Sequence, residues 1–190
     1  MGNLRSVVRA LERAGAKPCV TRDPEVVRRA DRLVMPGVGA LGDCMRTLGS
    51  LGLDAALRDR LASGRPFLGI CLGLEVLFEW GEEGPSDALG VLPGRIERFP
   101  KALGVRVPHM GWNEVRPERP HPLLARGYFY FVHAYRAVGV PDAAVAATTD
   151  YGGPFAAAVA FDSAVAVQFH PEKSQRAGLH LLERFLAWRP

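Results

Sequence analysis

The sharpest chemical signal in the sequence is a cysteine between glycines, in the segment Gly69-Ile-Cys-Leu-Gly73. The apolar run from Pro66 to Cys71 predicts a buried strand, and Leu72 to Trp80 predicts a helix that follows at once. Glycines permit the tight, strained turn that lifts a nucleophile above a sheet. The helix N-terminus lowers the pKa of such a thiol, and its free N–H groups can bind an oxyanion. We therefore expect Cys71 to be a nucleophile, although an inert buried cysteine is the common alternative.

A cysteine nucleophile needs a base, and the base needs an orienting group. His170 comes just after the apolar strand predicted at Ala164 to Val167, so it reaches the same sheet edge as Cys71 if the strands run parallel. Glu172 lies two residues on, close enough to hold one imidazole nitrogen while the other faces the thiol. The spacing predicts a Cys71-His170-Glu172 triad.

The other histidines carry weaker signals. His109 and His121 sit beside prolines and are expected in loops. His180 falls on the last predicted helix, either solvated or packed. His133 could line a pocket, and a structural role is at least as well supported.

The cysteines number three and are scattered without CxxC spacing, which argues against a disulfide framework and a structural zinc site. Cys19 and Cys44 have no nearby base and are expected in the core. Pro36-Gly-Val-Gly39, after a predicted strand from Arg32 to Met35, could present a backbone N–H to a neighbouring site or be a plain turn.

Length and composition favour one globular domain over residues 1–190. The net charge is +4, but the arginines are interleaved with acidic residues and form no basic stripe, so nucleic-acid binding is not expected. No run of 18 apolar residues is present, and the N-terminal segment lacks a signal-peptide core. We expect a soluble cytoplasmic protein that binds neither nucleic acid nor membrane.

Helical and strand patterns alternate in the first half, which is typical of a parallel sheet with crossover helices. The predicted elements there are an N-terminal helix ending near Gly15, a strand over Lys17 to Thr21, a helix starting at Asp23-Pro24, and two helices within Leu41 to Ser63 that are broken near Gly49 to Gly52.

The second half has the alternating apolar pattern and tight turns of antiparallel strands. We expect strands over Gly90 to Phe99, Gly104 to Met110, Tyr128 to Val138, Ala143 to Thr149, Phe155 to Phe161 and Ala164 to Phe169. A closing helix is predicted from about Gln175 to Trp188.

Taken together, these motifs resemble the class I (triad) glutamine amidotransferases, and within them the glutaminase subunits of imidazole glycerol phosphate synthase. The resemblance spans nearly the whole chain, through GNLRSV, PGVGALGDCM, GICLGLEVLFE, LGVLPGRIERF, VPHMGWNEV, YFYFVHAY and QFHPEKSQRAG. It implies an α/β, flavodoxin-like three-layer sandwich, with a mixed central sheet flanked by helices.

By this resemblance, Cys71 is the nucleophile, His170 the general base and acid, and Glu172 its orienting group. The family's oxyanion hole implies the backbone N–H groups of Val38 and Leu72. The residues implied to bind substrate are Gly37, Gly39, Glu75, Ala134 and Tyr135, and those implied to face a partner are Trp112 and Asn113.

The resemblance also implies a reaction and a partner. L-Glutamine would be hydrolysed to glutamate and ammonia through a cysteine thioester, without a cofactor or metal. The ammonia would pass to a (β/α)8-barrel cyclase subunit in a heterodimer, which forms imidazole glycerol phosphate and an aminoimidazole carboxamide ribotide in histidine biosynthesis.

The sequence departs from the family pattern at two places. Met1 stands directly before the Gly2-Asn-Leu-Arg-Ser6 motif, so we expect that the family's first strand is missing and that the start codon is mis-assigned, testable by mass spectrometry of the native protein. Glu75 stands where most relatives have glutamine, and a carboxylate cannot donate a hydrogen bond unless it is protonated. We expect weaker glutamine binding from Glu75.

Three other functions fit parts of the pattern. Cysteine hydrolases and chaperone-like proteins share the nucleophile turn, but many carry histidine where Leu72 stands here. A catalytically inactive binding module would use the same fold without needing the triad. The glutaminase subunit of vitamin B6 synthesis differs in its partner, so co-purification would separate it.

Overall fold

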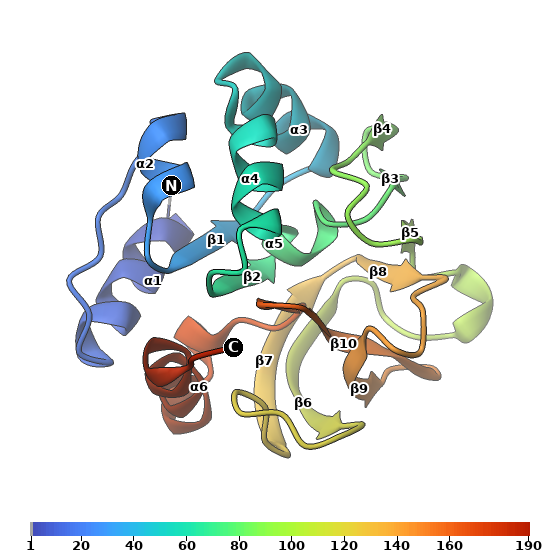
Figure 1. The fold of residues 1–190 in the computed structure, drawn as a ribbon. Helices are drawn as coiled ribbons and strands as arrows, with labels where there is room; N and C mark the ends of the chain where they lie inside the picture. Colours follow the sequence, from blue (N-terminus) through green and yellow to red (C-terminus); the bar gives the residue numbers. More distant parts are fainter. Residues whose placement is uncertain (1) are drawn as a thin grey trace.

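The computed structural model describes residues 2–190, with side chains from residue 4 onward; Met1 and the hypothesis about the start codon lie outside this range. The α-helices are α1 (Gly2–Arg13), α2 (Pro24–Arg29), α3 (Leu41–Ser50), α4 (Leu53–Ala62), α5 (Leu72–Glu75) and α6 (Gln175–Ala187). Short 3-10 helices cover Lys101–Leu103 and Pro171–Lys173. Figure 1 shows the arrangement of these elements along the chain.

A mixed sheet of seven strands forms the centre, in the order β1-β2-β11-β10-β9-β6-β7. Its strands are β1 (Leu33–Gly37), β2 (Phe67–Cys71), β6 (His109–Pro117), β7 (Gly127–His133), β9 (Val145–Asp150), β10 (Pro154–Phe161) and β11 (Ala164–Val167). β1, β2 and β11 run parallel, whereas the remaining neighbours pair antiparallel. The carboxyl ends of the parallel strands therefore meet at one edge, where β2 and β11 deliver their following residues.

A second sheet has the order β4-β3-β5-β8. Its strands are β3 (Trp80–Gly81), β4 (Ser86–Asp87), β5 (Arg95–Arg98) and β8 (Tyr135–Val138). β7 and β8 are separated only by Ala134, so the chain passes from one sheet to the other at a single residue.

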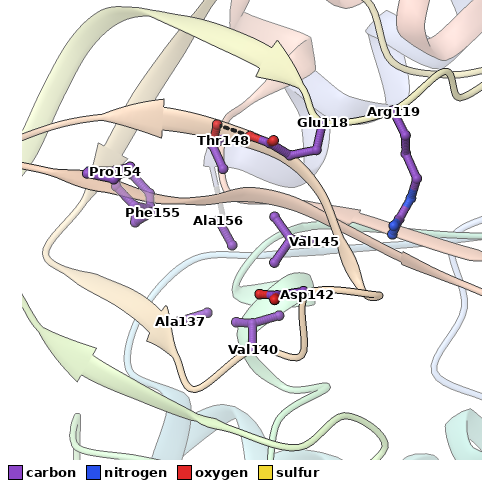
Figure 2. A pocket seen from close by; sticks show the side chains of 10 residues that line it. All are labelled: Glu118, Arg119, Ala137, Val140, Asp142, Val145, Thr148, Pro154, Phe155 and Ala156. Carbon is purple, nitrogen blue, oxygen red and sulfur yellow. Dashed lines mark hydrogen bonds between the residues drawn. The ribbon is translucent and has the colours of Figure 1, made fainter.

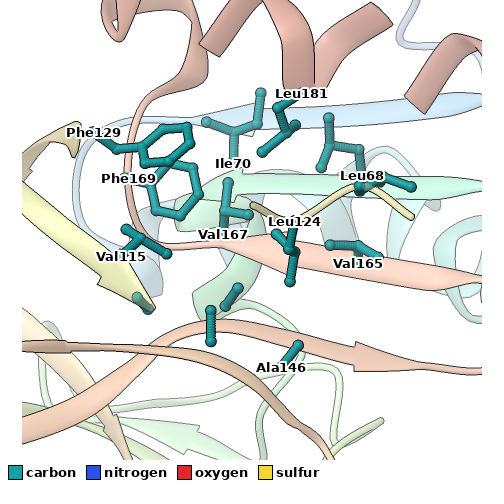
Figure 3. Packing of buried hydrophobic residues seen from close by; sticks show 14 of the residues in the cluster. Leu68, Ile70, Val115, Leu124, Phe129, Ala146, Val165, Val167, Phe169 and Leu181 are labelled. Atoms are coloured by element: carbon teal, nitrogen blue, oxygen red, sulfur yellow. The ribbon is translucent and has the colours of Figure 1, made fainter. Parts of the chain in front are cut away.

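Two apolar cores cover opposite faces of the parallel strands, because side chains alternate along a strand. On one face, Leu68, Ile70 and Val167 pack against α1 and α6, as Figure 3 shows for Leu181. On the other, Phe67 and Ala166 pack with α3, α4, α5 and the second sheet. Helices thus flank both faces of a mixed sheet, which is the predicted three-layer α/β architecture.

Several predicted elements are confirmed. The Asp23-Pro24 start of α2 is present, with the Asp23 carboxylate accepting from the Glu25 N–H at 2.8 Å. The break between the two central helices falls at Leu51-Gly52, and Gly52 adopts the left-handed conformation (φ 65°). The closing helix and the antiparallel second half are also as expected.

The strand predicted over Lys17 to Thr21 is wrong. This segment has no regular structure, and Cys19, expected in the core, is exposed. Apolar residues there indicated a strand, but a strand needs a hydrogen-bonding neighbour. Within the described residues the sheet ends at β1, whose residues are all half-buried.

Four other boundaries differ. The strand expected over Gly90 to Phe99 covers only Arg95–Arg98. The helix predicted to Trp80 ends at Glu75, because the carbonyls of residues 76–78 accept instead from the 89–92 segment. The strand expected over Gly104 to Met110 begins only at His109 and continues to Pro117. The strand expected over Tyr128 to Val138 is divided between two sheets. All four depend on pairing between distant segments, which a local pattern does not encode.

Candidate active site

Cys71 occupies the strand-to-helix turn predicted for it. β2 ends at Cys71 and α5 begins at Leu72. The backbone of Cys71 has φ 54° and ψ −106°, a region that non-glycine residues avoid at a cost of about 1–3 kcal/mol. Such strain persists only where the surrounding structure enforces it, and it turns the side chain away from the strand direction.

The two glycines beside Cys71 are required by close backbone approach. A Cβ atom on Gly73 would lie 2.0 Å from the carbonyl oxygen of Met35, and one on Gly69 would lie 2.3 Å from that of Gly73. Any side chain at either position would displace backbone atoms of β1 or of the turn itself. The sequence interpretation of these glycines is therefore confirmed, and the contacts give its reason.

His170 and Glu172 form the second half of the site. The Nδ1 atom of His170 lies 2.7 Å from Glu172 Oε1, and both side chains are fully buried. The backbone N–H of His170 donates to the Tyr130 carbonyl at 2.9 Å, which attaches this segment to β7. A carboxylate on Nδ1 places the proton there, so in the neutral ring Nε2 carries the free lone pair that a base needs.

Parallel pairing brings Cys71 to the same edge as this segment. Ile70 of β2 is the register partner of Val167 of β11, so the residues that follow each strand lie side by side. No hydrogen bond joins Cys71 to His170 among the described residues; Nε2 of His170 is buried without a partner. The amide Nε2 of Gln168 instead lies 3.8 Å from the Cys71 sulfur. The structure thus places the three predicted residues at one edge of the sheet and leaves Nε2 of His170 without a hydrogen-bond partner.

The thiol pKa runs opposite to the expectation of a lowered value. Burial raises the pKa of Cys71 well above its ordinary range, and the Glu75 carboxylate raises it further. The N–H of Leu72 lowers the pKa of the thiol, as the helix-terminus argument requires, but burial outweighs this contribution. The thiol is therefore neutral in the free chain, and its activation depends on proton transfer to a base.

Gln168 is a site residue that the sequence interpretation missed. Its amide Nε2 donates to Glu75 Oε1 at 3.0 Å and approaches the Cys71 sulfur, so it bridges the two. Burial raises the pKa of Glu75 to about 7, and the Gln168 hydrogen bond opposes part of that rise. The available signal was its position two residues before His170, directly after β11.

The Pro36-Gly-Val-Gly39 loop adjoins the nucleophile. Gly37 is the register partner of Cys71 across β1 and β2, and a Cβ atom on Gly37 would lie 2.7 Å from the Cβ of Leu72. Gly39 has φ 105°, a conformation that favours glycine, and Val38 between them is exposed. The loop is close enough to contribute an N–H group, and that role stays a prediction.

The residues expected to bind substrate or partner occupy different surfaces. Ala134 and Tyr135 form the junction between β7 and β8, with the Ala134 carbonyl accepting from Phe99 N–H at 3.1 Å. Trp112 is exposed on β6, but Asn113, by strand alternation, points to the other face, where its amide donates to the Asp150 carbonyl at 2.7 Å. The two side chains therefore lie on opposite faces of β6, and the partner-facing role of both stays a prediction.

The weaker histidines and cysteines fall in mixed places. His109, expected in a loop, is buried in β6 beside His133, because its strand pairs with β7. His121 lies in the loop between β6 and β7 as expected, and His180 is exposed on α6. Cys44 is half-buried, and burial raises its pKa to about 11, so it is a weak nucleophile.

Cavity size does not locate this site. A cavity of about 420 Å³ lies between β9, β10 and the segment after β8, as Figure 2 shows, and no triad residue lines it. Glu118 there bonds to Thr148, and Arg119 donates to the Ala143 carbonyl. The described residues contain no group of three or more metal-binding side chains.

Comparison with known proteins agrees with the geometry. The model of the family "Glutamine amidotransferase class-I" matches residues 1–188. The chain belongs to this family, and it is an α/β enzyme of the glutamine amidotransferase type. It is 50% identical to the imidazole glycerol phosphate synthase subunit HisH of Methylococcus capsulatus, over all of this chain and 94% of that protein. The protein of the same name from Synechococcus elongatus is 48% identical over 98% of this chain and 88% of its own length.

Solved structures show the same fold at lower sequence identity. A glutamine amidotransferase crystal structure superposes with a TM-score of 0.76 at 24% identity, covering 97% of this chain and 94% of that one. PurLQS from Thermotoga maritima superposes with a TM-score of 0.75 at 18% identity, covering 96% and 91%. These likenesses support the architecture, and the site depends on the residues described above.

Proposed function

We propose that this chain hydrolyses L-glutamine to L-glutamate and ammonia, as the glutaminase subunit of an imidazole glycerol phosphate synthase. The observation that carries the proposal is the strained Cys71 turn at the same sheet edge as the buried His170–Glu172 pair. Relatives of that name, about half identical over nearly their full length, support the choice of synthase. All 190 residues would form one amidotransferase domain, because both cores share the central sheet.

In the proposed reaction, Cys71 attacks the side-chain carbonyl carbon of glutamine. His170 Nε2 takes the thiol proton, a C–S bond forms, and the oxygen gains charge that the N–H groups of Leu72 and Val38 would stabilise. His170 then returns the proton to the leaving nitrogen, the C–N bond breaks, and ammonia departs. Water next attacks the thioester, His170 accepts its proton, the C–S bond breaks to release glutamate, and the proton passes from His170 to the Cys71 sulfur. Glu172 stabilises the imidazolium at each stage.

We expect substrate binding to bring about the proton transfer from Cys71 to His170 that does not occur in the free chain. The unpartnered His170 Nε2 and the raised thiol pKa both describe a resting site in which the proton stays on sulfur. We expect Gly37, Gly39, Glu75, Ala134 and Tyr135 to line the glutamine site. Glu75 carries a charge where an amide would donate, so it should weaken glutamine binding above its pKa of about 7.

The partner would dock on the exposed face of the β6–β7 ribbon. Met110, Trp112 and Tyr128 are large apolar side chains that are all exposed there. By strand alternation and register they share one face, opposite the buried His109 and Phe129. Such a patch suits a protein partner, and we assign it to the (β/α)8-barrel cyclase subunit of a heterodimer.

No helix in the described part of the chain has the length and apolar character to cross a bilayer. We propose a cytoplasmic location, because the proposed reaction is a step of amino-acid biosynthesis.

The test is a glutaminase assay on the chain with and without the cyclase subunit of the same organism. Cys71→Ala should lose at least about 1,000-fold in kcat, since covalent catalysis ends with the sulfur. Cys44→Ala is the matched control, because that half-buried cysteine has no base, and it should keep wild-type activity. Ammonia release by Cys71→Ala at the wild-type rate would refute the proposal.

A further inference from the structure

Two buried histidines face each other across β6 and β7, outside the candidate triad. His109 and His133 are register partners, 3% and 6% exposed, and His109 Nδ1 lies 3.0 Å from His133 Nε2. Their surroundings are aromatic. His109 stacks on Phe131 and on Tyr151, with ring centroids 4.6 and 3.9 Å apart, and His133 lies 5.4 Å from the Phe99 ring. Apolar rings would fill this space without the cost of burying polar nitrogens.

The partners of the pair fix where its protons are. Nδ1 of His133 lies 2.6 Å from the Tyr135 carbonyl oxygen, which can only accept, so this nitrogen carries hydrogen. In a neutral ring Nε2 of His133 must then accept, and His109 Nδ1 donates to it. His109 Nε2 in turn accepts from Asn113 Nδ2 at 3.2 Å. The result is a one-directional chain of hydrogen bonds from Asn113 to the Tyr135 carbonyl.

The chain exists only while both rings are neutral. A second proton on either histidine would place two donors opposite each other, or a donor opposite the Asn113 amide. Burial keeps both rings neutral, lowering the pKa of His109 to about 4 and that of His133 to about 3. The hydrogen-bond pattern and the burial therefore require the same protonation state.

The two ends of the chain hold separate segments. Asn113 also donates to the Asp150 carbonyl at 2.7 Å, which ties β6 to the end of β9. At the other end, His133 holds the carbonyl of Tyr135, the first residue of β8, just beyond the junction between the sheets. The Tyr135–Arg136 peptide, directly after the Ala134–Tyr135 junction, is therefore held by a side chain of the preceding strand.

The same strand also holds the triad segment. Tyr130 of β7 accepts from the His170 N–H at 2.9 Å and donates its own N–H to Ser174 Oγ at 2.9 Å. Charge on His170 would further lower the pKa of His133, which reflects how near the two rings lie. β7 thus supports His170 along its length and the Ala134–Tyr135 junction at its end.

We propose that His109 and His133 are positioning residues for glutamine binding: as a neutral pair they fix the Tyr135 carbonyl, and with it the Ala134–Tyr135 junction, relative to His170. The inference rests on the proposed glutaminase function. A ring that only filled the core would need no donor at Nδ1, whereas orientation of the peptide depends on the bond to the Tyr135 carbonyl. Phenylalanine would keep the packing and lose the bond; asparagine would lose packing and keep a donor where Nδ1 stood.

The kinetic test compares His133→Phe with His133→Asn in the complex with the cyclase subunit. We expect KM for glutamine to rise about tenfold in His133→Phe and to stay within about threefold of wild type in His133→Asn, the range of one hydrogen bond. We expect His133→Asn to have a lower melting temperature than His133→Phe, because asparagine leaves a cavity. His121→Phe, a half-buried histidine that packs on Trp188, is the control and should leave KM unchanged.

A second measurement is independent of activity. Imidazole 15N shifts of the wild-type chain at pH 7 should show both histidines as neutral Nδ1–H tautomers. A proton on Nε2 of either ring would overturn the inference, as would an unchanged KM in His133→Phe or an equal rise in both His133 variants. A wild-type complex without glutaminase activity would refute the proposed function itself, which separates the two failures.

Discussion

Two buried polar clusters flank β7, and they differ in how completely their hydrogen bonds are made. In the His109–His133 pair every ring nitrogen has a partner. In the triad region, His170 Nε2, Glu172 Oε2 and Gln168 Oε1 are buried without a partner among the described residues. Each unmade bond costs about 1–3 kcal/mol. The hydrogen bonds of the histidine pair are therefore complete, whereas the triad region has polar atoms that remain available to a substrate.

Burial alone does not distinguish the clusters. His170 is as deeply buried as His109 and His133. The difference is in the hydrogen-bond partners: the ring nitrogens of the pair meet acceptors and donors on adjacent strands, while Nε2 of His170 has no partner among the described residues. A functional site is therefore recognised here by unsatisfied polar atoms beside a strained nucleophile, and the ~420 Å³ cavity elsewhere lacks both features.

The largest effect should come from a substitution in the triad. Glu172→Gln removes the charge that stabilises the His170 imidazolium and permits the wrong tautomer. We expect kcat of the glutaminase reaction to fall at least about 100-fold, with little change in melting temperature. Steady-state kinetics in the complex measure this.

Glu183→Gln on the exposed face of α6 is the matched control and should have wild-type kcat. If kcat of Glu172→Gln stayed within about threefold of wild type, Glu172 would not be the orienting group.

A smaller effect should follow from Glu75→Gln, which removes a buried charge beside the nucleophile. Glu75 raises the pKa of Cys71, so its removal should move the acid limb of the kcat/KM profile to lower pH. An amide there can also donate to glutamine, and KM should fall about threefold. An unchanged KM and pH profile would show that Glu75 does not act on the site.

The same substitution has a stability consequence with a definite sign. The folded pKa of Glu75 is about 7, above its ordinary value of 4.5, so the folded state holds this proton more tightly than the unfolded state. Wild-type stability is therefore lost as pH rises from 4.5 through 7. In urea unfolding at pH 8, the free energy of unfolding of Glu75→Gln should exceed that of wild type by on the order of 1–3 kcal/mol. The difference should be smaller at pH 4.5.

The smallest effect concerns the His109–His133 pair. The folded pKa values of His109 and His133 lie below the ordinary 6.5, so their contribution to stability is complete above pH 6.5 and is lost as pH falls toward about 4 and 3. Between pH 7 and 4.5, the free energy of unfolding of the double variant His109→Phe/His133→Phe should fall by about 1–2 kcal/mol less than that of wild type. Urea unfolding at both pH values measures this, and an identical loss in the two proteins would contradict neutral burial of the pair.

Features encoded by neighbouring residues were predictable from the sequence. Gly69, Cys71 and Gly73 specify a turn within five residues, and His170 and Glu172 are two residues apart, so their contact needs no distant partner. The Asp23 cap and the break at Gly52 are equally local. The family resemblance drew on the same short motifs.

Features that depend on distant segments were not. The Lys17 to Thr21 segment has a strand-like pattern but no strand beside it, and the helix after Cys71 stops where the 89–92 segment takes its carbonyls. His109 looked like a loop residue until pairing with β7 buried it against His133. Gln168 gained its position next to Cys71 and Glu75 only through the parallel register of β2 and β11.

Local sequence was sufficient to predict the nucleophile turn, the His170–Glu172 pair and the amidotransferase family, because each depends on short runs of consecutive residues. Long-range packing sets the order of the strands, the direction of the Cys71 pKa shift and the contact between the two buried histidines. Burial and strand register are properties of the assembled chain: the helix terminus acts on the thiol locally, but removal of water by the whole fold outweighs it.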